Sequence, residues 1–131
     1  MLRVHSTLPE DLEDLVHKTI GCCIAVHRVL GPGLLEGIYA RALGLELAAA
    51  GIPFQREKAY PVTYRGEVLC QQYLDLVVED QIVVELKSVE QLIPVNHAQL
   101  LSYMRVAHKR VGLLINFNVV VLKDGLTRKV L

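Results

Sequence analysis

Two acids and a lysine lie close together in a part of the chain that favours β-structure. Asp75 lies within one strand-like segment, and Glu85-Leu86-Lys87 ends the next one, ten residues later. A hairpin register centred on residue 80 would place Asp75 opposite Glu85, with their Cβ atoms roughly 5 Å apart. Lys87 would then share their face, because side chains two apart on a strand point the same way. Like charges that face each other destabilise a sheet, so this spacing predicts a bound cation that offsets the repulsion.

The chemistry of these groups suits a hard divalent metal. Asp75 and Glu85, together with the backbone carbonyl of Leu86, offer the oxygen ligands that Mg²⁺ or Mn²⁺ prefers. Such an ion lowers the pKa of a coordinated water and neutralises charge that develops in a transition state. Lys87 could orient or deprotonate that water, or stabilise a phosphorane. The residues therefore predict metal-assisted phosphodiester hydrolysis, and the alternative is an ordinary hairpin whose charged side chains face water.

Helical periodicity appears in three segments around these residues. Apolar side chains recur at steps of three or four over 7–30, 34–51 and 94–106. Thr7 and Glu10 fit a capping box at the start of the first segment. The sequence therefore predicts two helices before the candidate site and one after it.

Strand-like stretches fill most of the remaining chain. They cover residues 54–64, 67–78, 81–88 and 111–117, and a final hairpin is predicted for 119–122 and 126–130 around Asp124-Gly125. The apolar stretch at 111–117 follows a helix, so we expect it to join the interior of a mixed sheet by a crossover connection.

Bulk composition limits the classes of protein to consider. With 131 residues, of which 52% are hydrophobic, the chain is expected to form one domain over 1–131, with an apolar surface that could serve a homodimer or a protein partner. Lys plus Arg equals Asp plus Glu at 14 each, so no overall field would attract nucleic acid. No apolar run is long enough to span a membrane, and we expect a cytoplasmic protein with no membrane contact.

Three motifs, in this order along the chain, resemble the PD-(D/E)XK nuclease superfamily. Residues 33–39, Gly-Leu-Leu-Glu-Gly-Ile-Tyr, match the motif that names the GxxExxY branch of that superfamily. The acid and lysine positions already described form the second motif. Residues 99–103, Gln-Leu-Leu-Ser-Tyr, match a QxxxY helix motif found beside the active site in helicase-associated exonucleases. Leu74 departs from the pattern, because it stands where the superfamily name has proline.

The resemblance implies an architecture and an activity. The expected fold is an α/β PD-(D/E)XK nuclease-like (restriction-endonuclease-like) core, with an αβββαβ order and a mixed four-stranded sheet flanked by helices, plus an extra N-terminal helix and a C-terminal hairpin. The expected activity is Mg²⁺- or Mn²⁺-dependent hydrolysis of nucleic acid, DNA rather than RNA. Glu36 would be a further metal ligand and catalytic group, and Gln99, Tyr103 and Tyr39 would bind substrate, with Gln99 and Tyr103 alternatively supporting Lys87.

Two other functions fit the same residues. A non-catalytic module could use the same cleft to bind nucleic acid or a protein, and neutral net charge favours this alternative because nucleic-acid enzymes are usually more basic. Hydrolysis of a small phosphate ester is the other. No aromatic platform that would indicate single-stranded substrates is evident in the sequence.

Overall fold

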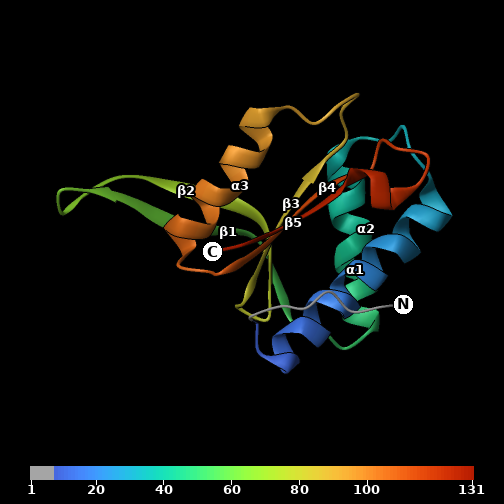
Figure 1. The fold of residues 1–131 in the computed structure, drawn as a ribbon, viewed down its shortest axis with the longest axis horizontal. Helices are drawn as coiled ribbons and strands as arrows, with labels where there is room; N and C mark the ends of the chain where they lie inside the picture. The colour runs from blue at the N-terminus through green and yellow to red at the C-terminus, as the bar shows by residue number, and fades with distance from the viewer. Residues whose placement is uncertain (1–7) are drawn as a thin grey trace.

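The computed structural model describes residues 8–131 as a mixed sheet with helices on both faces (Figure 1). The elements, in chain order, are α1 (Glu10–Leu30), α2 (Glu36–Ala49), β1 (Phe54–Tyr64), β2 (Glu67–Val78), β3 (Ile82–Lys87), α3 (Pro94–Ala107), β4 (Val111–Asn116), the 3₁₀ helix η1 (Leu122–Gly125) and β5 (Leu126–Val130).

The sheet has the order β1-β2-β3-β4-β5. Strands β3 and β4 are parallel, and the other neighbouring pairs are antiparallel. Helix α3 makes the crossover between the two parallel strands, as such a connection requires. The predicted α/β class, the αβββαβ order and the strands at 54–64 and 67–78 are therefore confirmed.

Two apolar layers hold the helices to the sheet. Helices α1 and α2 pack on one face, and α3 packs on the other (Figure 1). Gly112 in β4 lets α3 approach closely, because an added Cβ would lie 2.5 Å from the sulfur of Met104 and 2.9 Å from a methyl carbon of Leu100. This contact fixes the distance of α3 from the sheet, and α3 carries two of the predicted site residues.

The predicted C-terminal hairpin is wrong in its first strand. Residues 119–122 do not form a strand, and β5 instead pairs antiparallel with β4, which makes the sheet five-stranded rather than four-stranded. The carbonyl of Val119 lies 2.8 Å from His27 Nε2, so this segment is bonded to α1 rather than to β5. Gly125 packs against β4 so closely that a Cβ would lie 2.1 Å from the carbonyl oxygen of Asn116. Strand β5 thus pairs with the free edge of β4, which the Asp124-Gly125 turn in the sequence could not reveal.

The helix ends also differ slightly from the prediction. Helix α1 begins at Glu10, and Pro9 at its N-cap makes no side-chain capping hydrogen bond. The proposed cap, Thr7, lies outside the residues that the structure describes. Helix α2 begins at Glu36, two residues later than predicted. Within residues 8–131, none of the helices combines the length and apolar character needed to cross a bilayer.

Strands β1 and β2 continue past the body of the protein as a two-stranded ribbon (Figure 1). Glu57 has a positive φ of 51° and makes no ladder pair, although the pairs on either side of it, Arg56 with Leu76 and Lys58 with Leu74, keep the register. This irregularity lies opposite Asp75, and a register shift follows between Val62 and Thr63. We call residues 58–74, beyond Glu57 and Asp75, the distal ribbon.

Candidate active site

The predicted acids lie where β2 and β3 separate. The backbone ladder between the two strands follows a register centred on residue 80, as predicted, and its last pair is Leu76 with Val84. At the next position, Asp75 and Glu85, the backbone amides bond to side-chain carboxylates instead of to carbonyls of the opposite strand. The amide of Asp75 donates to Glu85 Oε1 at 3.1 Å, and the amide of Leu86 donates to Asp75 Oδ2 at 2.9 Å. The two carboxylates are therefore held by the opposite strands at a fork in the sheet.

Glu85 is the most perturbed acid of this pair. Its side chain lies in the interior, with a residue exposure of 5%. Burial, and then the negative charge of Asp75, raise the pKa of Glu85 to about 8, although Lys87 acts in the opposite direction. At neutral pH the pair without a cation therefore keeps a proton, and a positively charged ligand would favour its loss.

Helix α3 brings the predicted polar residues to the same place. Lys87 Nζ donates to Gln99 Oε1 at 3.2 Å. Tyr103, one turn further along the helix, is half-buried, and partial burial together with the charges of Glu85 and Asp75 raises the pKa of its phenol, against a hydrogen bond to Gln99. The structure thus brings Gln99 and Tyr103 to the fork.

Glu36 reaches the fork from the opposite layer, at the first position of α2. Its side chain is exposed, but partial loss of hydration and the charge of Asp75 raise the pKa of its carboxyl, while Lys87 lowers it. Within residues 8–131, no group of three or more Asp, Glu, His or Cys side chains is close enough together to hold a metal ion. Glu36 is therefore in electrostatic range of the pair but does not form a compact three-carboxylate set with it.

The predicted role of Tyr39 in substrate binding is wrong, because this side chain is completely buried, at 0% exposure. Its hydroxyl donates to the carbonyl of Gly31 at 2.5 Å and accepts from the amide of Leu34 at 3.1 Å. Its ring stacks on Phe117, with centroids 4.5 Å apart. Tyr39 therefore holds the loop that leads into Glu36. Glu36 and Tyr39 are three residues apart on α2, yet Glu36 faces solvent and Tyr39 faces the core.

We expect Tyr39→Phe to lower the free energy of unfolding by about 1–2 kcal/mol, because the amide of Leu34 and the carbonyl of Gly31 both lose a buried partner. Urea denaturation would measure the change. If Tyr39→Phe left stability unaltered and raised only the KM for a substrate, the buried structural role would be refuted.

Two residues that sequence reasoning missed hold the loop after Lys87. The Ser88 hydroxyl donates to the carbonyl of Leu34 at 2.5 Å, which joins this loop to the segment before Glu36. The amide group of Asn116 donates to the carbonyl of Val89 at 2.9 Å and accepts from its N–H at 3.1 Å. The only sequence signal was a polar residue at the end of an apolar strand. These contacts fix the two loops on either side of the fork.

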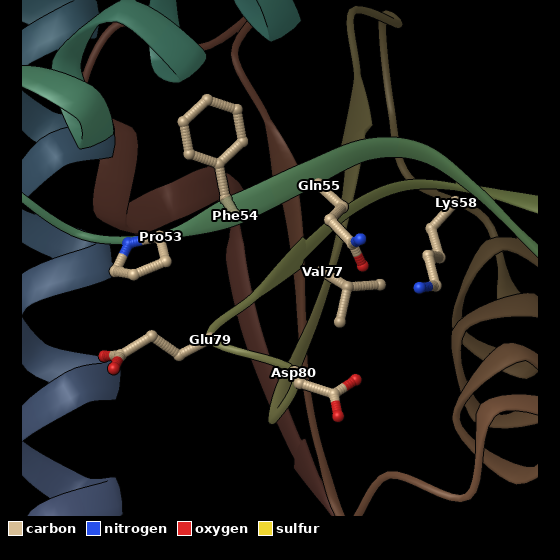
Figure 2. Close-up of a pocket in the computed structure, with 7 residues that line it drawn as sticks. All are labelled: Pro53, Phe54, Gln55, Lys58, Val77, Glu79 and Asp80. Carbon is tan, nitrogen blue, oxygen red and sulfur yellow. The ribbon is translucent and has the colours of Figure 1, made fainter.

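A cavity of about 530 Å³ lies beside the site rather than at it (Figure 2). Its polar lining includes Lys58, Glu79 and Asp80, of which the two acids belong to the turn at the far end of β2. Asp80 pairs with Lys109 at 3.0 Å, and in Figure 2 the Glu79 carboxylate points away from Asp80. This cavity therefore lacks paired acids, and the fork remains the candidate for chemistry.

Comparison with known families agrees with this geometry. A sequence model of the PD-(D/E)XK nuclease superfamily matches residues 13–129. No curated protein and no solved structure gives a significant match. The match covers all the strands except the last residue of β5, and it includes every residue of the fork. The chain belongs to the PD-(D/E)XK nuclease superfamily.

Proposed function

We propose that this protein is a nuclease that uses Mg²⁺ or Mn²⁺ to hydrolyse phosphodiester bonds of nucleic acid, DNA in preference to RNA. The observation that carries the proposal is the pair of carboxylates, Asp75 and Glu85, held together at the fork beside Lys87. Membership of the superfamily supports a nuclease rather than another metal hydrolase. The motif at residues 33–39 further supports a place in the GxxExxY branch.

The donor set fits a divalent cation of this kind. Mg²⁺ is commonly held by one or two carboxylates, with water and substrate oxygens completing its shell. Asp75 and Glu85 would supply the two carboxylates and the carbonyl of Leu86 a third oxygen, whereas Glu36, which is not gathered with the pair, would contact a water of the ion's shell from the opposite layer. The raised pKa of Glu85 marks a place where nearby positive charge would favour the ionised carboxylate. When bound, the cation would lower the pKa of a water and offset charge that develops on the phosphate.

The chain's own residues would orient the reacting groups. Lys87 would orient the attacking water and donate to a phosphate oxygen, and its hydrogen bond to Gln99 limits the positions of its ammonium group. The half-buried phenol of Tyr103, close to Glu85, can donate a hydrogen bond to the phosphate backbone. Glu36 would accept a proton from the water, and the raised pKa of its carboxyl, caused by partial desolvation and the charge of Asp75, supports this role.

Titration of Mg²⁺ and Mn²⁺ into the wild type and Asp75→Ala, followed calorimetrically, tests the metal site. Both proteins would then be assayed on linear, circular and single-stranded DNA and on RNA. We expect binding and cleavage to disappear together in Asp75→Ala, because the variant leaves Glu85 without its partner carboxylate. Metal binding without cleavage of any substrate would replace this proposal with a non-catalytic nucleic-acid or protein-binding module. Absence of metal binding in the wild type would refute the site.

A further inference from the structure

One face of the distal ribbon is left uncovered next to the fork. Tyr60 and Leu74 pack under α3, so they lie on the face of the ribbon that the helix covers. Side chains alternate along a strand, and Tyr73 and Gln71 therefore point to the opposite face. Both are exposed, and the residues across from them in β1, Ala59 and Pro61, are exposed as well.

Tyr73 is the large aromatic group on this open face. Its exposure is 62%, and its direct cross-strand neighbour is the small Ala59, so no side chain opposite it covers the ring. Tyr73 precedes Asp75 by two residues in the same strand, which corresponds to about 7 Å along β2. A phosphodiester held at the fork would therefore place an adjoining nucleotide within reach of this ring.

The open face carries no charge that would repel a polyanion. The residues identified on it, Ala59, Pro61, Gln71 and Tyr73, are all uncharged, whereas Lys58 lies over the ring of Tyr60 on the face that α3 covers. Pro61 lies in the outer strand, where it offers no N–H to a further strand. The polar amide of Gln71 extends the open face away from Tyr73.

We propose that Tyr73 is a stacking platform for an unpaired base, and that the open face of the ribbon next to the fork, around Ala59 and Tyr73, therefore guides a single strand of nucleic acid, or a frayed duplex end, into the fork. This inference rests on the proposed nuclease function, because it assigns the substrate class of that same site. An exposed aromatic ring binds the face of any base, whereas a paired base in a duplex exposes only its edges. The ribbon would thus select unpaired strands without reading their sequence.

The test uses the full chain in EDTA, so that binding is measured without metal-dependent cleavage. Fluorescence anisotropy would give the affinities for a labelled 15-nucleotide single-stranded DNA, the same sequence as RNA, and the DNA as a blunt duplex. We expect Tyr73→Ala to bind single-stranded DNA roughly 5- to 50-fold more weakly than the wild type. Tyr73→Phe should stay within about 2-fold, because the ring is kept.

Tyr64→Ala is the matched control. Tyr64 lies at the end of β1 beside the ribbon turn and is 66% exposed, so the substitution removes a similar ring far from the fork. Its affinity should stay within about 2-fold of wild type. Equal losses in Tyr64→Ala and Tyr73→Ala would overturn the assignment of a single platform. So would tighter binding of the duplex than of the single strand by the wild type.

Two further outcomes separate this inference from the proposed function. If Tyr73→Ala changed the mass measured by light scattering but not the affinity, the open face would be a self-association surface and the inference would fail. Metal-dependent cleavage that Tyr73→Ala leaves unchanged on single strands would refute the platform and leave the nuclease proposal standing. Binding that depends on Tyr73 in a protein that cleaves nothing would support the platform and refute hydrolysis.

Discussion

Replacing Lys87 with methionine is expected to lower kcat for phosphodiester hydrolysis by about 10²- to 10⁴-fold while divalent cation binding is retained. Methionine keeps an unbranched side chain of similar volume, one atom shorter, but removes the ammonium group that bonds to Gln99 Oε1. The carboxylates of Asp75 and Glu85 are unchanged. Calorimetric titration of Mn²⁺ and single-turnover cleavage would separate the two effects.

A lysine outside the fork provides the control for this prediction. Lys109 forms an ion pair with Asp80 at 3.0 Å in the region of the β2–β3 turn. Lys109→Met removes the same charge and should leave kcat within about 2-fold of wild type, because this pair is peripheral to the chemistry. The proposed role of Lys87 would be untenable if Lys87→Met cleaved at the wild-type rate, or if it lost metal binding as Asp75→Ala is expected to do.

Glu85→Gln should make the metal-free protein more stable and at the same time abolish metal binding. In the folded protein the pKa of Glu85 is raised to about 8, against an ordinary value of 4.5. The unfolded chain therefore releases this proton at lower pH than the folded chain does, and the stability of the wild type falls as pH rises between these two values. Above about pH 8 the folded protein carries the full cost of the buried charge. Glutamine removes that cost and keeps an oxygen to accept the amide of Asp75.

Urea denaturation in EDTA at pH 5 and pH 8.5 would test the sign of this effect. The gain in free energy of unfolding should be small at pH 5 and at least about 1 kcal/mol in favour of Glu85→Gln at pH 8.5, since one unit of pKa shift corresponds to about 1.4 kcal/mol. Saturating Mg²⁺ should stabilise the wild type but not the variant. Glu67→Gln, at an exposed position of the ribbon, is the control and should show no such pH dependence. A variant less stable than wild type at pH 8.5 would contradict the prediction.

The fork shows how far local sequence could predict the site. The turn between β2 and β3 joins neighbouring segments, so a register centred on residue 80 followed from a hairpin turn at residues 79–81, and it is confirmed. The positions of Gln99 and Tyr103 on one helical face were equally local. What spacing could not predict is that Glu85 would be nearly inaccessible, since its burial depends on α3 packing over the sheet.

Tyr39 and the C-terminal segment show where local sequence failed. The helical period put Glu36 and Tyr39 on neighbouring positions of α2, but the loop at Gly31 and the ring of Phe117 decided that Tyr39 would be buried. Residues 124–125 do lie in a turn, the end of η1, but the strand after it pairs with β4 instead of with residues 119–122. The edge of β4 was free, and Gly125 has no Cβ to clash with the carbonyl of Asn116.

The sequence by itself determined the three helices, the strands of the core, the hairpin register and the placing of Asp75, Glu85 and Lys87 on adjacent strands. These features depend on helical period, on strand-forming residues and on the turn at residues 79–81, all of which act between residues close together in the chain. Only the tertiary structure decided the raised pKa of Glu85, the approach of Glu36 from the opposite layer and the uncovered face around Tyr73. Each of these features depends on whether a segment distant in the chain packs against the side chain. Periodicity within one segment carries no information about such contacts.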